Sequence, residues 1–222
     1  MSGFAPIGLF GGTFDPIHLG HLRLAQELAD ALGLARVRFI PAATPPHRNL
    51  PRVSGAHRLQ MVRIAIAGNP LFEAEECELR RDGISYTYDT LIELRDELSG
   101  HPLCLLMGAD AFAALTTWHR WQELFDLAHV VIAHRPGFQL KELQAALPPA
   151  LREIYQRRLV DAPARLRANE GSILTCEITA LDISATNIRA LLAQGSSPRY
   201  LAPDPVLAYI DQHRLYKEHD AR

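Results

Sequence analysis

The sequence predicts an α/β fold, with a single domain over residues 1–222 built on one parallel, doubly wound sheet of strand order 3-2-1-4-5. Two observations lead to this prediction. A short apolar run ends in Gly11 and Gly12, an amphipathic helix follows, and residues 37–41 then have the pattern of a second strand. Two strands joined by a helix in this way pair in parallel. Residues 103–107 form a continuous apolar run, which is typical of a strand buried on both faces of such a sheet.

The first helix is expected to begin beside two histidines. Asp15 followed by Pro16 is typical of an N-cap and a first helical residue, so the helix start is placed between Pro16 and Leu19. His18 and His21 are three apart and therefore share one edge of the first turn. Because a helix N-terminus presents free N–H groups and a positive dipole end, this turn is predicted to bind an anion, with the imidazoles as further donors.

Three glycines around this turn leave room for a ligand. Gly11 and Gly12 let the backbone approach a phosphate with no Cβ in between. Gly20 lies inside the helical pattern, where glycine costs roughly 1 kcal/mol against alanine, so a flat surface for a base or a sugar is the expected reason. The segment matches neither G-x-G-x-x-G nor G-x-x-x-x-G-K-[ST], which argues against a dehydrogenase and a P-loop NTPase.

A loop over residues 42–53 follows the second strand at the carboxyl edge of the sheet, where open α/β folds bind ligands. The loop contains a stiff, partly basic Pro-Pro-His-Arg run, and its His47 and Arg48 are candidates for a second phosphate. A solvated loop with incidental charge is the alternative.

The alternation of helices and strands then continues. Apolar spacing predicts a helix over residues 57–67, a short edge strand over residues 73–79, and a helix that follows from residues 85–91 and runs to about Leu98. The first of these helices is ended by Gly-Asn-Pro at residues 68–70.

The central strand at residues 103–107 ends in Gly108, Ala109 and Asp110. In strand order 3-2-1-4-5 this strand lies beside the first one, and the helices that follow them leave to opposite faces. The crevice between two such strands is the switch point at which these sheets bind ligands. Gly108 and Asp110 are therefore expected to line the same pocket as Gly11 and Gly12.

Further segments complete the sheet and its cover. They are a helix opened by residues 118–121, a fifth strand at residues 130–133, an amphipathic helical excursion over residues 140–167 with a break at residues 148–149, a strand at residues 172–176, and a terminal helix over residues 209–216. The two tryptophans, Trp118 and Trp121, are three apart, and they either belong to the core or stack on a flat ring of the ligand.

A second group of candidate site residues is the segment 183–189, Ile-Ser-Ala-Thr-Asn-Ile-Arg. Ser184 is a natural N-cap, and Gly195 is a natural end for the helix that follows. Thr186 and Arg189 are three apart and lie opposite the core-facing side chains of this helix. Hydroxyls and a guanidinium at a helix N-terminus predict a second anion site, although the segment alone could be an ordinary capped helix.

The length, composition and net charge of the chain argue against several classes of protein. With 222 residues, 48% of them hydrophobic, the chain can bury one sizeable core. A formal net charge of −2 without a long basic run argues against nucleic acid and anionic membranes as partners. The first residues carry no basic leader, and no stretch approaches roughly 18 uninterrupted apolar residues, so a cytoplasmic protein is expected. The three cysteines are scattered, which disfavours a zinc site that includes the two histidines.

The two motifs resemble those of a known superfamily. Residues 11–21, G-G-T-F-D-P-I-H-L-G-H, resemble the G-G-x-F-D-P-x-H-x-G-H signature of the nucleotidylyltransferases, and residues 183–189 resemble their second signature, I-S-x-T-x-x-R. The resemblance implies the Rossmann-like fold of that superfamily and the transfer of an adenylyl or cytidylyl group from a nucleoside triphosphate.

Features in the middle of the chain narrow the resemblance to the bacterial nicotinate-nucleotide adenylyltransferases. They are P-P-H-R at residues 45–48, Y-T-Y-D-T at 86–90, G-A-D at 108–110, the tryptophan at 118, and R-P-G at 135–137. The resemblance implies ATP and nicotinate mononucleotide as substrates, deamido-NAD and pyrophosphate as products, and Mg²⁺ carried by the triphosphate with no metal ligand from the protein. Nicotinamide mononucleotide or phosphopantetheine is the alternative acceptor. The oligomeric state, including a homo-oligomer, is left open.

The resemblance also implies roles for single residues. The residues expected to take part in the reaction are His18, His21 and Arg189. Those expected around ATP are Gly11, Gly12, Thr13, Phe14, His18, Gly20, His21, Gly108, Asp110, Ile183, Ser184, Thr186 and Arg189. Those expected around nicotinate mononucleotide are Gly12, Thr13, His47, Arg48, Thr87, Trp118, His119 and Arg135. Relatives often have tyrosine where this chain has His119, so the backbone N–H groups of Trp118 and His119, and not that side chain, are expected to hold a pyridine carboxylate.

Two other classes of protein remain as alternatives. A nucleotide-binding regulator without catalysis would tolerate loss of the histidines and of Arg189, and all of them are present. The H-x-G-H part also resembles class I aminoacyl-tRNA synthetases, but those are longer and carry a K-M-S-K-S loop that this sequence lacks. A fragment of such a synthetase would also need a basic face, which the composition does not offer.

Overall fold

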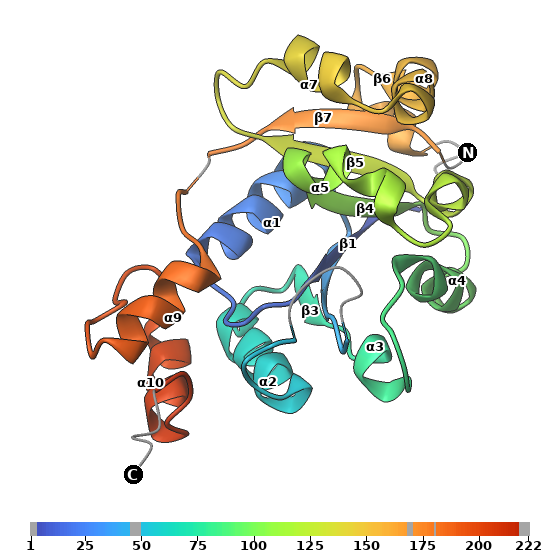
Figure 1. Cartoon of the computed structure of the whole chain (residues 1–222). Coiled ribbons are helices and arrows are strands. Elements are labelled where there is room, and N and C mark those ends of the chain that lie inside the picture. Colours follow the sequence, from blue (N-terminus) through green and yellow to red (C-terminus); the bar gives the residue numbers. More distant parts are fainter. Residues whose placement is uncertain (1–3, 45–49, 168–170, 180, 218–222) are drawn as a thin grey trace.

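The computed structural model describes residues 4–44, 50–167, 171–179 and 181–217, and a seven-stranded sheet forms the centre of this described part (Figure 1). The strands are β1 (Ile7–Gly12), β2 (Arg36–Pro41), β3 (Phe72–Ala74), β4 (Leu103–Gly108), β5 (His129–His134), β6 (Leu159–Val160) and β7 (Ile173–Glu177). They follow the order β3-β2-β1-β4-β5-β7-β6, and all neighbours are parallel. The predicted α/β class and the order 3-2-1-4-5 are confirmed, and β7 and β6 extend the sheet beyond β5.

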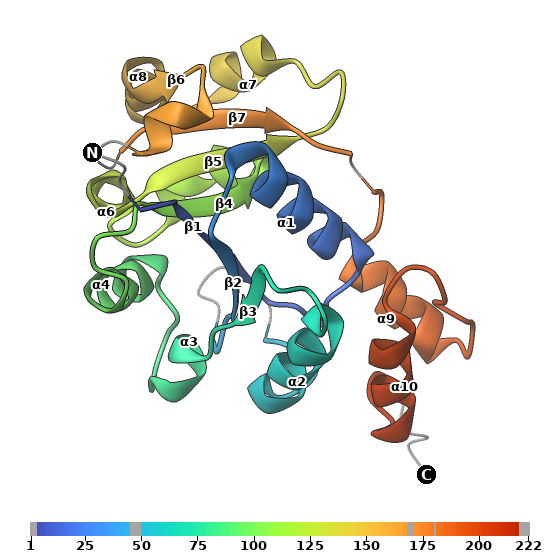
Figure 2. The same ribbon diagram turned by 180° about the vertical axis from the view of Figure 1, so that it is seen from behind.

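Helices lie on both faces of this sheet. They are α1 (Leu19–Leu32), α2 (Gly55–Ile66), α3 (Cys77–Arg80), α4 (Thr87–Glu97), α5 (Ala109–Ala113), α6 (Leu124–Leu127), α7 (Leu140–Ala146), α8 (Pro149–Arg158), α9 (Ala185–Ala193) and α10 (Asp204–Gln212), with 3-10 turns η1 (Leu115–Thr117), η2 (Trp121–Glu123) and η3 (Pro163–Arg167). Figure 1 shows α5 in front of β4 and β5, and Figure 2, seen from behind, shows α1 in front of the same strands. None of the helices within the described ranges has the length and hydrophobicity needed to cross a bilayer.

Alternate residues of each strand pack into two hydrophobic cores, one on each face of the sheet. In β5, Val131 and Ala133 belong to the core that includes α1, while Val130 and Ile132 belong to the core that includes α5. Because successive side chains of a strand point to opposite faces, a strand covered on both sides must be apolar throughout. This explains the continuous apolar runs of β4 and β5. The packing on both faces also holds the loops at the carboxyl edge in place.

The sheet divides between β1 and β4 at its carboxyl edge. The ladder between these strands joins residues 7–9 to residues 103–105, whereas the ladder between β1 and β2 continues to Gly12 and Pro41. The helices that follow β1 and β4 then leave to opposite faces of the sheet. This is the predicted switch point, and Gly11 and Gly108 lie at its two sides.

Two boundaries near the site differ from the sequence prediction. The N-cap of α1 is His18, and Asp15 does not cap the helix, because its side chain is used in contacts with distant segments. The predicted edge strand over residues 73–79 is only the three-residue β3. The Oε1 atom of Glu75 accepts a hydrogen bond from the N–H of Cys77 at 2.9 Å, and the chain turns there into α3.

Two further boundaries differ in the second half of the chain. Residues 118–121 do not open a long helix, because Arg120 has a left-handed backbone with φ of 51°, and only η2 and the four-residue α6 follow. The terminal helix is α10, which ends at Gln212, because Arg214 and Tyr216 have φ angles of 52° and 61°.

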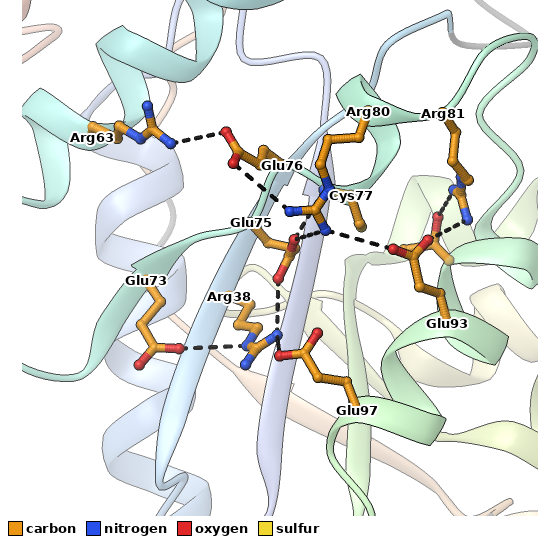
Figure 3. Close-up of polar contacts among 11 residues, drawn as sticks. Arg38, Arg63, Glu73, Glu75, Glu76, Cys77, Arg80, Arg81, Glu93 and Glu97 are labelled. Atoms are coloured by element: carbon orange, nitrogen blue, oxygen red, sulfur yellow. Dashed lines mark hydrogen bonds and ion pairs between the residues drawn. The ribbon is translucent and has the colours of Figure 1, made fainter.

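Charged side chains connect β2 and the segment after β3 to α3 and α4 (Figure 3). Arg38 of β2 is 10% exposed and lies 2.8 Å from carboxylate oxygens of both Glu75 and Glu97. Arg80 of α3 lies within 4 Å of three carboxylates, those of Glu75 and Glu76 just before α3 and that of Glu93 in α4. These ion pairs hold α4, whose first residue Thr87 is a predicted site residue, against the edge of the sheet.

Candidate functional site

Two histidine rings stack at the start of α1. The ring centroids of His18 and His21 lie 3.6 Å apart, with 20° between the ring planes. The Nδ1 atom of His21 accepts a hydrogen bond from the backbone N–H of His18 at 3.3 Å. Because Nδ1 is an acceptor, the neutral His21 ring carries its proton on Nε2, and that atom is the donor of this ring.

His18 is buried, and only 6% of it is exposed. Among the described residues its Nδ1 atom has no hydrogen-bond partner. Burial lowers the pKa of His18 to about 4, so the ring is neutral at neutral pH. His18 therefore offers a dipole and one N–H donor at the helix start, and it carries no fixed positive charge there.

The glycines leave space where the sequence predicts a ligand. A Cβ atom added to Gly11 or to Gly108 would meet nothing within 4 Å, so the surface beside both residues is open. A Cβ on Gly20 would lie 3.1 Å from Nδ1 of His18 and 3.7 Å from the carbonyl oxygen of Ile183. The contact with Ile183 would be an ordinary one, so the absence of a Cβ at Gly20 makes room mainly for the ring of His18.

The structure brings the two predicted anion sites together. The Nη1 atom of Arg189 in α9 donates to the carbonyl oxygen of Asp15 at 2.7 Å, and Nη2 lies 3.3 Å from Oγ1 of Thr186. Ser184 is the N-cap of α9, because its Oγ accepts from the N–H of Asn187 at 3.1 Å. The predicted cap is confirmed and the two helix starts lie together, whereas the binding of ATP by either one stays a prediction.

Backbone contacts join this region to the start of α4. The N–H of Ala42 donates to the carbonyl of Gly12 at 2.9 Å. The hydroxyl of Ser85 then accepts from the N–H groups of Ala43 and Thr44, at 3.0 and 3.3 Å. Residues 42–44, directly after β2, are thus fixed on one side to β1 and on the other side to the residues just before Thr87.

The residues expected around the second substrate are only partly placed. The ring of His119, an exposed residue, lies 4.4 Å from that of Tyr86, next to Thr87. Trp118 is half-buried against the core on the α5 face, and Arg135 is exposed directly after β5. His47 and Arg48 lie outside the described residues.

One of the two predicted backbone donors is engaged within the protein. The N–H of Trp118 donates to the carbonyl of Leu115 at 2.9 Å, where it closes the turn η1. The binding of a carboxylate by this N–H and by that of His119 stays a prediction.

The sequence did not point to two residues that hold this region. Arg58 of α2 is only 1% exposed, and its guanidinium donates to the carbonyls of Thr13 at 2.8 Å and of Ala43 at 3.4 Å. Burial lowers the pKa of Arg58. Tyr216, after α10, donates from its hydroxyl to Oδ1 of Asp15 at 2.7 Å. No local pattern could identify either residue, since α2 carries a second arginine, Arg63, and Tyr216 lies far from the site in sequence.

Comparisons with known proteins agree with this geometry. The profile of the cytidylyltransferase-like family matches residues 9–191. A protein of Dechloromonas aromatica (strain RCB), named as a probable nicotinate-nucleotide adenylyltransferase, is 51% identical over 96% of this chain and 98% of its own length. A protein of the same name from Aeromonas hydrophila is 51% identical over 96% of this chain and 97% of its own length.

Solved structures share the fold at lower sequence identity. The nicotinic acid mononucleotide adenylyltransferase of Plasmodium falciparum, complexed with APC, superimposes with a TM-score of 0.71. Its identity is 16%, and the match covers 96% of this chain and 98% of that one. From the family profile and the relatives at 51% identity, the chain belongs to the cytidylyltransferase-like family, together with the probable nicotinate-nucleotide adenylyltransferases.

Proposed function

We propose that this chain transfers the adenylyl group of ATP to nicotinate mononucleotide and releases pyrophosphate, giving nicotinate adenine dinucleotide for the synthesis of NAD. One observation carries the proposal, which is that Arg189 reaches from the start of α9 to the backbone of Asp15 just before α1. Two helix starts with different donors thereby meet at the carboxyl edge of the sheet, where open α/β folds bind ligands. The relatives that are 51% identical carry the name of this activity, and they support the choice of acceptor.

In this proposal the triphosphate lies across both helix starts. His18, His21, Thr186 and Arg189 supply side-chain donors, and the positive dipole ends of α1 and α9 favour the anion. The open surface beside Gly11, Gly108 and Asp110 would take the nucleoside part of ATP. Phe14 is buried, with its ring under Gly12, so any contact it makes with ATP comes from its backbone.

The reaction needs alignment and charge stabilisation more than proton transfer. A phosphate oxygen of nicotinate mononucleotide forms a bond to the α-phosphorus of ATP, while the bond from that phosphorus to the bridging oxygen breaks. Pyrophosphate leaves with the electron pair of the broken bond. Because the attacking phosphate is already an anion, no general base is required, and the donors at the two helix starts stabilise the charge on the α-phosphate and the pyrophosphate.

Mg²⁺ is expected to arrive with ATP, and its part is to neutralise charge on the triphosphate. Within the described ranges, no group of three or more His, Cys, Asp or Glu side chains is arranged to hold a metal ion. We therefore propose phosphate oxygens as the principal ligands of Mg²⁺. The chain itself holds the phosphates in place.

The acceptor is proposed to bind beside the start of α4. Three of the predicted groups are available there. Thr87 is the first residue of α4, Arg135 directly follows β5, and the backbone N–H of His119 comes shortly after η1. A neutral amide in place of the carboxylate would gain less from an N–H donor and from a guanidinium. Preference for nicotinate over nicotinamide is therefore part of the proposal.

Release of pyrophosphate tests the proposal directly. The purified chain is mixed with ATP and Mg²⁺ and, in parallel reactions, with nicotinate mononucleotide, nicotinamide mononucleotide or phosphopantetheine. We expect fast release with the first acceptor alone. Faster release with nicotinamide mononucleotide or phosphopantetheine would show that this compound is the acceptor. No release with any of the three would contradict the proposed activity.

A further inference from the structure

Asp15 joins four segments that are far apart in the sequence. It lies in the turn between β1 and α1, and only 5% of it is exposed. Its Oδ2 atom accepts from the N–H of Arg52, at the end of the loop after β2, at 2.8 Å. Its Oδ1 atom accepts from the hydroxyl of Tyr216 at 2.7 Å, and its carbonyl accepts from Arg189 at 2.7 Å.

The contacts of Asp15 determine where the Arg189 guanidinium points. Nη1 of Arg189 donates to the Asp15 carbonyl and lies 3.9 Å from its Oδ2 atom, while Nη2 contacts Thr186. These hydrogen bonds use two of the five N–H groups of a guanidinium. Because these hydrogen bonds fix the guanidinium of Arg189, its other three N–H groups point in a defined direction. A flexible arginine side chain would have no such fixed orientation.

Arginines hold the backbone on both sides of Phe14. Phe14 has a left-handed backbone with φ of 48°, an unfavourable conformation for a residue with a large side chain. Arg58 donates to the carbonyl of Thr13, and Arg189 donates to the carbonyl of Asp15. The Asp15 carboxylate also offsets the charge of both guanidiniums. The turn that leads to the histidines and the orientation of Arg189 therefore depend on the same carboxylate.

We propose that Asp15 is a positioning residue, and that its carboxylate, held by Tyr216 and by the backbone of Arg52, aims Arg189 at the triphosphate. The inference depends on the proposed function, since it assigns Arg189 to ATP. Asp15 itself makes no contact with substrate in this scheme. Tyr216 acts through Asp15, and this gives the segment after α10 a part in the reaction.

A double-mutant cycle distinguishes positioning from a merely structural role. In Asp15→Asn, the amide cannot accept from both Tyr216 and Arg52, and the negative charge beside Arg189 is lost. We expect kcat/KM for ATP to fall at least about tenfold when Arg189 is present. In the Arg189→Ala background we expect the same change to lower it less than about threefold, because the group that Asp15 positions is already gone.

Tyr216→Phe provides the same test with a smaller disturbance of the fold. It removes one hydroxyl, and its effect should also be larger when Arg189 is present than when it is absent. If Asp15→Asn does not fold, this second cycle decides. Tyr209→Phe is the matched control, because its hydroxyl contacts Nδ1 of His57 at 2.9 Å, away from Asp15. The control should keep kcat/KM within about twofold of the wild type.

Binding of α,β-methylene-ATP, followed by calorimetry without an acceptor, repeats the cycle independently of turnover. If the wild type binds this analogue but transfers nothing to nicotinate mononucleotide, the proposed acceptor is wrong, and the cycle on binding still tests Asp15. If the effects of Asp15→Asn and Arg189→Ala simply multiply in both assays, Asp15 does not act through Arg189 and the inference is overturned.

Discussion

Replacing His18 by asparagine should remove the loss of stability that a buried neutral imidazole causes on acidification. The pKa of His18 is lowered by burial from 6.5 to about 4. The unfolded chain therefore binds a proton at His18 below pH 6.5, whereas the folded chain binds it only near pH 4. Above pH 6.5 both states hold His18 neutral, and the residue contributes its full stability to the folded state. As the pH falls from 6.5 toward 4, only the unfolded state takes up the proton, so the free energy of unfolding decreases.

The size of the effect follows from the difference between the two pKa values. A difference of about 2.5 pH units at about 1.36 kcal/mol per unit gives about 3 kcal/mol of unfolding free energy. The ring is well shielded from solvent, so this value needs little reduction for screening. Asparagine does not titrate, and it is a good N-cap residue, so the start of α1 should be kept.

Urea unfolding at pH 7, 6, 5 and 4 measures this effect. We expect the free energy of unfolding to fall between pH 7 and pH 4 by about 3 kcal/mol less in His18→Asn than in the wild type. His213→Asn is the control, because it removes an exposed imidazole. Equal pH profiles for the wild type and His18→Asn would refute the argument that His18 is buried as a neutral ring.

Three further predictions concern rate, ligand access and stability. His18→Ala should lower kcat by ~10²–10³, with much less effect on ATP affinity, and turnover within a few-fold of the wild type would contradict its role. Gly11→Ala should unfold like the wild type in urea yet raise KM for ATP, since its Cβ meets no protein atom, and an unchanged KM would mean that no ligand lies there. Arg38→Ala should cost about 3 kcal/mol of unfolding free energy because it leaves buried Glu75 without its closest cation. Arg36→Ala, which breaks an exposed pair, should cost less than about 1 kcal/mol, and equal losses for both variants would contradict the argument from burial.

Much of the fold followed from short-range patterns. The apolar run at β4, the switch from strand to helix after Gly12, and the Ser184 cap each involve residues a few positions apart. Such patterns report burial and periodicity directly, and they were enough for a parallel, doubly wound sheet, whose usual strand order supplied the prediction 3-2-1-4-5. They were less reliable at the ends of elements, as at Glu75, where one side-chain hydrogen bond to the backbone of Cys77 turns the chain out of the sheet.

The candidate site was likewise predicted in part and missed in part. The residues of the two signatures were found in the sequence, and the structure brings their segments together through Arg189. The role of Asp15 as a junction was not predicted, since Asp before Pro has the local pattern of a helix cap. Arg58 was missed because a buried arginine has no distinct pattern among the other polar residues of a helix.

The sequence by itself determined the fold class, the strand order and the two helix starts that offer donors to an anion. Only the tertiary structure decided how those helix starts meet, which charges hold them, and that His18 is buried as a neutral ring. The physical reason is the distance along the chain. The contacts of Asp15 with Arg189 and Tyr216 join residues 174 and 201 positions apart, and such pairs leave no periodic signal. Burial, which sets the pKa of His18, depends on every segment packed around the ring.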